Sequence, residues 1–176
     1  MRIAISGAHF SGKTKLIKAL VKELSHYRSV EESYYLLNEE GYEFSNPPTV
    51  EDFEAQLNYS IKAIENSEDN TLFDRCPLDF LSYALTIQDN EELDTEDWIQ
   101  RMKGAIEKLD LIVFVPIEKR IPAPKSEDLE WRANVDEQLY EMVMNDSLGI
   151  LENVEVLEVT GSVEKRMSLI KEKLKV

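Results

Sequence analysis

The feature that most constrains this chain is the run GAHFSGKT at residues 7–14. It matches the pattern G-x-x-x-x-G-K-[ST] at every fixed position, and it follows a short apolar run at 2–6. From Lys15 onward the apolar residues take helical spacing, so the turn stands between a predicted strand and a predicted helix. In that setting backbone N–H groups converge on phosphate oxygens, aided by the positive end of the helix. The sequence therefore predicts a phosphate-binding loop at 7–14.

The residue types within this loop indicate what each position does. Lys13 is expected to reach the β- and γ-phosphates of a nucleotide, and the Thr14 hydroxyl to ligate Mg²⁺. For the side chains of His9 and Phe10 two interpretations stay open, namely contact with the ligand, or packing and solvent exposure. The residues expected to bind the nucleotide are Gly7, Ala8, His9, Phe10, Ser11, Gly12, Lys13 and Thr14.

Alternating strand-like and helix-like segments indicate the fold class. Apolar strand-like runs lie at 2–6, 29–31, 71–74, 111–115 and 154–159. Helical spacing fills the intervals, with Thr49 as a predicted N-cap and Pro77 as a predicted first helical residue. This alternation favours an α/β fold of three layers, with a central parallel sheet of about five strands and helices on both faces. No linker or repeat interrupts the pattern, so we predict one domain over 1–176.

The charge of the chain argues against several kinds of partner. Its 176 residues carry 20 Lys and Arg against 35 Asp and Glu, a net charge of −15. An acidic chain repels phosphate backbones and anionic lipid surfaces, so neither nucleic acid nor membrane is expected as a partner. Cys76 is the only cysteine, which excludes an internal disulfide and suits a reducing cytosol. The N-terminal run resembles neither a signal peptide nor a membrane span, so we predict a cytoplasmic protein; its oligomeric state stays open.

Acidic side chains at the carboxyl ends of predicted strands are the candidates for catalysis, because ligands of open parallel sheets bind beyond these ends. Asp74 ends the strand at 71–74 and is expected to hold Mg²⁺ or accept a proton. Arg75 is expected to clamp a phosphate, with a local ion pair as the alternative. Glu31 and Glu32 reach the same edge, where one acts as the base for an acceptor hydroxyl or both are solvated. The base is thus Glu31, Glu32 or Asp74.

Two further acids and a group of aromatic residues have mainly structural interpretations. Asp79 lies in a predicted first helical turn, where an acid complements the helix dipole, with binding of substrate hydroxyls as the alternative. Asp110 precedes its strand and so lies at the wrong end of the sheet. The aromatic residues that follow the second strand are expected mostly in the core, with stacking on an aromatic acceptor as the alternative. They are Tyr34, Tyr35, Tyr42, Phe44, Tyr59, Phe80 and Tyr83.

A charged segment after the most hydrophobic strand predicts a lid. Residues 118–132 contain two prolines and several cations, which is typical of a mobile loop, and we place the lid at roughly 118–134. Cations on a closing lid stabilise the charge that develops during phosphoryl transfer. Arg120 and Arg132 are preferred to the lysines because guanidinium is planar and forked. A solvated surface loop is the alternative.

Several segments carry a family resemblance that extends over nearly the whole chain: ISGAHFSGKTKL, LFDRCPLDFLSYAL, DLIVFVP and VTGSVEKRMSLI. They resemble the small AAA-type P-loop proteins grouped with the ribosylnicotinamide kinase domain of NadR, and more broadly the P-loop nucleoside and nucleotide kinases. The resemblance implies ATP and Mg²⁺ as cofactors and phosphoryl transfer to a small-molecule acceptor.

The resemblance also implies roles for individual residues. Thr160-Gly161-Ser162 resembles the loop that passes the adenine, which makes Gly161 a nucleotide contact. Glu32 matches a family glutamate that is often followed three positions later by arginine. Here that position is Tyr35, so nicotinamide riboside is not assumed as the acceptor. The residues that match catalytic positions are Lys13, Asp74, Arg75, Glu32, Arg120 and Arg132.

Two functions therefore compete. The first is an ATP-dependent kinase for a small molecule, a nucleoside or a nucleotide. The second is a P-loop ATPase switch that acts on a protein partner. GTP-specific switches resemble one another in an N-K-x-D motif, which the sequence lacks, and the −15 charge weakens a polynucleotide kinase.

Overall fold

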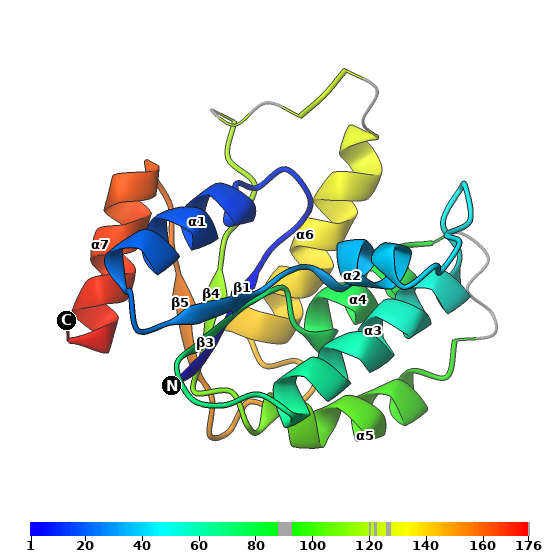
Figure 1. Cartoon of the computed structure of the whole chain (residues 1–176). Helices are drawn as coiled ribbons and strands as arrows, with labels where there is room; N and C mark the ends of the chain where they lie inside the picture. The colour runs from blue at the N-terminus through cyan, green and yellow to red at the C-terminus, as the bar shows by residue number, and fades with distance from the viewer. Residues whose placement is uncertain (88–92, 120, 122, 126–127, 176) are drawn as a thin grey trace.

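The computed structural model describes residues 1–87, 93–119, 121, 123–125 and 128–175 of the chain (Figure 1). Its strands are β1 (Arg2–Ser6), β2 (Arg28–Val30), β3 (Thr71–Asp74), β4 (Leu111–Phe114) and β5 (Glu155–Glu158). Its helices are α1 (Lys13–Glu23), α2 (Ser33–Glu39), α3 (Val50–Glu65), α4 (Pro77–Thr86), α5 (Thr95–Ile106), α6 (Leu129–Met144) and α7 (Val163–Leu174). Within the described residues, no helix combines the length and the apolar character that crossing a membrane requires.

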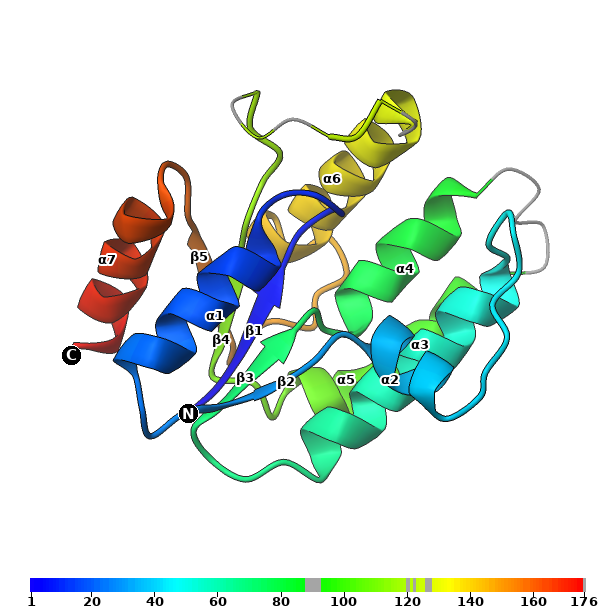
Figure 2. The same cartoon turned by 45° about the horizontal axis from the view of Figure 1, so that its top comes forward.

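The strands form one parallel sheet with the spatial order β2-β3-β1-β4-β5. Side chains alternate across the sheet, so Ile3 and Ile5 of β1 face one side and Ala4 the other, all of them buried. The first side packs against α1 and α7, and the second against α3, α4, α5 and α6. Figure 2 shows these two groups of helices on opposite faces of the sheet. The predicted α/β fold with helices on both faces is confirmed.

Capping residues fix where two of the helices begin. Thr49 Oγ1 accepts a hydrogen bond from the Asp52 N–H, and the Asp52 carboxylate accepts one from the Thr49 N–H, so the predicted N-cap of α3 is confirmed. For α6 the expected lid at roughly 118–134 extends too far, because the helix already begins at Leu129. The Asp128 side chain accepts from the Trp131 N–H at 2.9 Å and starts the helix early. The last part of the expected lid, residues 129–134, is therefore helical.

The carboxyl ends of the central strands lie together at one edge of the sheet. Ile5 pairs with Asp74 and Ser6 with Phe114, so β1, β3 and β4 end at nearly the same level. The glycine-rich loop leaves β1 at this edge and leads into α1 (Figure 2). Asp110 lies at the opposite end of β4, which agrees with its structural interpretation.

Candidate functional site

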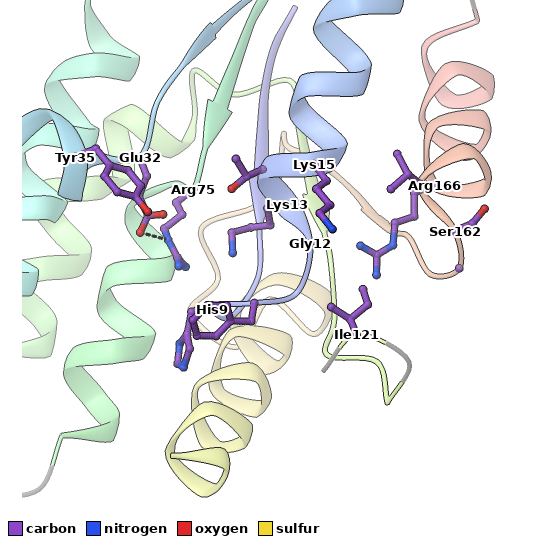
Figure 3. Close-up of a pocket in the computed structure, with 14 residues that line it drawn as sticks. His9, Gly12, Lys13, Lys15, Glu32, Tyr35, Arg75, Ile121, Ser162 and Arg166 are labelled. Atoms are coloured by element: carbon purple, nitrogen blue, oxygen red, sulfur yellow. Dashed lines mark hydrogen bonds and ion pairs between the residues drawn. The ribbon is translucent and has the colours of Figure 1, made fainter. Parts of the chain in front are cut away.

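A cavity of about 640 Å³ opens beside the glycine-rich loop (Figure 3). Gly12, Lys13 and Thr14 form one wall, where the loop enters α1. Glu32, which precedes α2, and Arg75, which follows β3, form another. The remaining lining residues are His9, Phe10, Lys15, Tyr35, Ile121, Gly161, Ser162, Val163 and Arg166. Segments that are far apart in the sequence thus meet around one loop.

Five consecutive carbonyl groups of this loop accept hydrogen bonds from cationic side chains. The donors come from α1, the turn after β3, α6 and α7. In loop order the pairs are Gly7 with Arg75 at 2.9 Å, Ala8 with Lys13 at 2.9 Å, His9 and Phe10 with Arg132 at 2.9 and 3.0 Å, and Ser11 with Arg166 at 2.9 Å. We call Lys13, Arg75, Arg132 and Arg166 the loop-binding cations.

These contacts fix how the end of the loop presents its N–H groups. The Ser11 carbonyl points to Arg166, so the Gly12 N–H, on the other side of the same planar peptide, points away from that guanidinium. The first N–H groups of α1 have no helical carbonyl before them. Glycine is required at both fixed positions of the pattern. A Cβ on Gly7 would lie 2.4 Å from the Val115 carbonyl oxygen, and Gly12 has a φ of +97°. The loop and the helix end thus offer donors and positive potential to an anion.

Lys13 is buried, with its ammonium group at the base of the cavity. Burial, together with the nearby charge of Arg75, lowers the pKa of Lys13 to about 8, although neighbouring carboxylates, Asp74 first among them, oppose this shift. A phosphate chain beside the ammonium favours its charged form. The position of Lys13 therefore suits the phosphate contact expected from the sequence.

Thr14 and Asp74 offer a fit for Mg²⁺. Thr14 Oγ1 lies 3.3 Å from Asp74 Oδ2, and Asp74 Oδ1 is buried without a hydrogen-bond partner among the described residues. Burial is the main cause that raises the pKa of Asp74. A hydroxyl and a carboxylate oxygen, completed by waters and phosphate oxygens, form the kind of incomplete oxygen shell in which Mg²⁺ binds with nucleotides. Within the described part of the chain no group of three His, Cys, Asp or Glu side chains has a geometry that could hold a metal ion by itself.

Arg75 and Glu32 form an ion pair at one side of the first cavity, with Arg75 Nε 2.6 Å from Glu32 Oε1 (Figure 3). Burial by itself raises the pKa of Glu32, but Arg75 and Lys13 outweigh it and the pKa is lowered. Glu32 is therefore ionised at neutral pH, whereas the pKa of Asp74 is shifted upward. Environments that push two neighbouring carboxyl pKa values apart are typical of sites that divide chemical roles between them.

Asp79 does more than complement a helix dipole, which is the role the sequence suggested. It is fully buried, and its carboxylate accepts hydrogen bonds from Ser6 Oγ at 2.7 Å and from the Gly7 N–H at 3.0 Å. It also caps α4 through the Cys76 N–H and lies 3.4 Å from Arg75 Nη1. Asp79 thus anchors the start of the phosphate-binding loop to the start of α4.

A second cavity, of about 460 Å³, adjoins the first. Both are lined by His9, Glu32 and Arg75, so the ion pair belongs to the wall that they share. The hydroxyl oxygen of Tyr83 accepts from the His9 N–H at 2.8 Å and lies 2.7 Å from His9 Nδ1. The other residues of this cavity are Tyr34, Phe44, Ser45, Asn46, Pro48, Phe53, Gln56, Phe80, Tyr83 and Trp131. A molecule in the second cavity would lie next to whatever occupies the first.

The structure brings most of the predicted site residues to these two cavities. Gly7, Ala8 and Ser11 form the backbone of the loop, Gly161 and the rest of the loop line the first cavity, and Asp74 meets Thr14. Glu31 is exposed and lines neither cavity. Arg132 lies behind the loop with its guanidinium on the backbone, and Arg120 lies outside the described residues.

Arg166 is the residue that sequence reasoning missed. Its side chain is 1 % exposed, and Nη2 donates to Glu118 Oε1 at 2.5 Å. The same oxygen accepts from the Gly161 N–H at 2.9 Å. The one available signal is helical position, because Arg166 and Ile170 share the buried face of α7. This signal identifies a buried arginine but not its partner.

Comparison with known proteins identifies relatives of this chain. A family model described as an AAA domain matches residues 2–166. A deoxyadenosine kinase from M. mycoides, solved with dCMP and dCDP, is similar at a TM-score of 0.66 and 18 % identity over 99 % of this chain and 98 % of that one. A thymidylate kinase from Candida albicans is similar at a TM-score of 0.62 and 15 % identity, over 99 % and 92 %. The NadR protein in complex with NR gives 0.62 and 17 %, over 99 % of this chain and 52 % of that one. No curated protein sequence gives a significant match.

Proposed function

The chain belongs to the family of AAA domains, and on that premise we propose that it is an ATP-dependent phosphotransferase acting on a small-molecule acceptor. The observation that carries the proposal is the wall shared by the two cavities. One cavity is built around the phosphate-binding loop, and the other opens on the far side of Glu32 and Arg75. Two adjoining sites suit a reaction between two bound molecules, and the kinases among the similar solved structures support this assignment.

In this proposal the first cavity holds the nucleotide. The loop N–H groups and Lys13 bind the β- and γ-phosphates, and Gly161 lies near the adenine ring of the nucleotide. Thr14 and Asp74 hold Mg²⁺, which neutralises negative charge on the phosphates when it is bound. Arg75, at the shared wall, faces the side from which an acceptor approaches the terminal phosphate.

The second cavity then holds the acceptor, with its hydroxyl group directed at Glu32. The ionised Glu32 carboxylate accepts a hydrogen bond from that hydroxyl and takes its proton as the oxygen attacks the γ-phosphorus. The bond between the γ-phosphorus and the β–γ bridging oxygen breaks, and ADP leaves. We favour Glu32 over Asp74 as the proton acceptor, because Glu32 lines both cavities and Asp74 lines neither. Glu31 is exposed and lines neither cavity, so we do not propose it as the proton acceptor.

Arg132 has a supporting role in the same proposal. Its donors are directed at the carbonyls of His9 and Phe10, so it shapes the loop from behind. Arg120 is proposed, on the family resemblance, as the arginine that a lid brings to the transferring phosphate.

The experiment that tests the proposal is an ADP-release screen. Purified protein with Mg-ATP is tested against nucleosides, nucleoside monophosphates, nicotinamide riboside and ring-free alcohols, with Lys13→Ala as the inactive control. A kinase shows ADP release that rises severalfold or more with one acceptor class, and the acceptor gains mass equal to a phosphoryl group. An ATPase switch shows slow release that no acceptor alters, and that result would remove the kinase assignment.

A further inference from the structure

Aromatic side chains form a large part of the lining of the second cavity. Six of its lining residues carry a phenyl, phenol or indole ring, and they come from α2, the segment after it, α3, α4 and α6. They are Tyr34, Phe44, Phe53, Phe80, Tyr83 and Trp131. A cavity with this lining favours a ligand that has flat apolar faces.

The rings already contact one another in stacked and edge-to-face arrangements. A further aromatic ring could join them in the same arrangements. Phe53 and Tyr83 are stacked, with their centroids 5.2 Å apart and their planes at 13°. Tyr83 and Trp131 meet edge to face, with their centroids 5.6 Å apart. Tyr34, which is 42 % exposed, lies against Phe44 with the centroids 4.4 Å apart. An aromatic ring that enters this group gains offset-stacked or edge contacts that a ring-free alcohol lacks.

The charges around the cavity oppose a phosphorylated acceptor. Among the described residues that line it, the charged ones apart from His9 are Glu32 and Arg75, and Arg75 is already paired with Glu32 at 2.6 Å and with Asp79 at 3.4 Å. Beside the wall that the cavities share, the charge neighbours of Lys13 are Arg75 and the three carboxylates of Glu32, Asp74 and Asp79, so two cations are matched by three anions. A phosphate monoester carries nearly two negative charges and is normally bound by arginines whose charges are available to it.

The loop-binding cations nearest to this cavity do not supply that charge. Arg132 is buried, and its Nε and Nη2 donate to the carbonyls of His9 and Phe10. Three other lining residues, Ser45, Asn46 and Gln56, are polar but uncharged. Among the described lining residues, the arginine, Arg75, is therefore already paired, and a neutral or cationic molecule fits better than a dianion.

From these observations we infer that the acceptor is an alcohol with a planar aromatic ring, of the nucleoside type, and that it carries no phosphate group. The inference rests on the proposed function, because it names the molecule that receives the phosphoryl group. It distinguishes an acceptor without a phosphate group from a phosphorylated one. Both kinds of kinase have a similar fold, since the similar structures include a deoxyadenosine kinase and a thymidylate kinase. Ring stacking binds the acceptor, and the net charge beside the shared wall excludes the phosphate monoester.

The test compares matched acceptors in the ADP-release assay. Each nucleoside is assayed beside its own 5′-monophosphate, and ribose and glycerol serve as ring-free alcohols. We expect at least one nucleoside or heteroaryl alcohol to exceed both its monophosphate and the ring-free alcohols about tenfold or more in kcat/KM. A monophosphate that equals or exceeds its nucleoside overturns the inference and leaves the kinase assignment intact. If Mg-ATP binds but no acceptor stimulates ADP release, the proposed function itself fails.

A variant at the exposed ring tests the stacking directly. Tyr34→Ala removes one ring from the lining of the second cavity. Because the Tyr34 side chain is exposed and lies outside the core, the variant should still fold. The KM for the aromatic acceptor should rise about fivefold while the KM for ATP stays unchanged. Tyr140→Ala is the matched control, because Tyr140 is 40 % exposed and lines neither cavity. Equal acceptor KM values in Tyr34→Ala and the parent protein would overturn the role of the rings.

Discussion

Arg166 Nη1 donates a hydrogen bond to the carbonyl oxygen of Ser11 at 2.9 Å, although 155 positions separate the two residues in the sequence. The contact joins α7 to the phosphate-binding loop and completes the series of loop-binding cations. Arg166 also links the loop to Gly161, because Glu118 binds both Arg166 and the Gly161 N–H. We therefore assign Arg166 a positioning role, acting on the nucleotide through the loop backbone.

Replacement of Arg166 should weaken the binding of the phosphate chain without changing the preference between adenine and guanine nucleotides. Arg166→Lys keeps the charge but loses the fork that reaches both Ser11 and Glu118, so we expect the Kd for Mg-ATP to rise about tenfold. Calorimetry should show the same factor for inorganic tripolyphosphate and an unchanged ratio of ATP to GTP affinity. Arg101→Lys, on the far helix α5, is the control. A changed base preference with unchanged tripolyphosphate binding would show that Arg166 reads the base instead.

Lys13→Ala should abolish most of the nucleotide affinity. The variant removes a charge-assisted contact to the phosphates, a loss of about 1.5–3 kcal/mol, which corresponds to a Kd for Mg-ATP about 10- to 100-fold weaker. Lys18→Ala, at an exposed position of the same helix, should bind like the parent protein. Calorimetry on both proteins, with circular dichroism to verify folding, makes the comparison. Equal affinity in Lys13→Ala would contradict the assignment of the loop.

Asp74→Asn should spare the fold and impair the use of Mg²⁺. Asparagine preserves the shape and the contact with Thr14 but removes the charge that a hard cation requires. Turnover should fall about 100-fold, and the gain in ATP affinity on adding Mg²⁺ should shrink, as measured by calorimetry with and without the metal. Asp110→Asn, at the other end of the sheet, should leave both quantities unchanged. A fully active Asp74→Asn protein would place the metal elsewhere.

Asp52→Asn should destabilise the protein at neutral pH but not in strong acid. Burial alone raises the pKa of Asp52, but hydrogen bonds from the N–H groups of Thr49 and Ser45 outweigh it and lower the pKa below 3.8. The carboxylate therefore stabilises the folded state above pH 3.8, and this contribution is lost as the pH falls through the lowered value. Urea unfolding at pH 7 should show a loss of about 1 kcal/mol, the typical value of an N-terminal cap.

The same measurement repeated in acid should bring the Asp52→Asn and parent curves together. Asp69→Asn, which alters an exposed carboxylate, is the control and should show a much smaller loss at pH 7. A stability difference that does not change with pH would mean that the side chain acts through shape and not through its charge.

Local patterns in the sequence were sufficient to predict the fold and the position of the loop. The run at 2–6, the fixed glycines and the Thr49 cap each depend on neighbours a few residues away, and all three are found in the structure. The early start of α6 was missed because the prolines before it suggested a loop. The cap that decides the matter, Asp128, stands among other charged residues and has no distinctive local pattern.

Long-range contacts set the limit on what the sequence could predict in the site. Asp79 was expected to complement a helix dipole, yet its carboxylate also binds Gly7, 72 positions away. Arg132 was expected over the phosphates but lies behind the loop. Such pairings depend on which elements pack together, and neither periodicity nor charge pattern specifies the partner of a particular cation.

The hydrogen bonds to the loop carbonyls have a consequence for how this protein becomes competent during synthesis. The GAHFSGKT segment is synthesised before α6 and α7, which bind three of its five cation-bound carbonyl groups and follow more than a hundred residues later. A nascent chain therefore carries the complete motif before the long-range contacts that hold the loop in the folded structure can form, and we expect its affinity for triphosphate to increase once α6 and α7 have docked. For the same reason, we expect the motif to bind nucleotides weakly when it is placed in another protein that lacks these arginines.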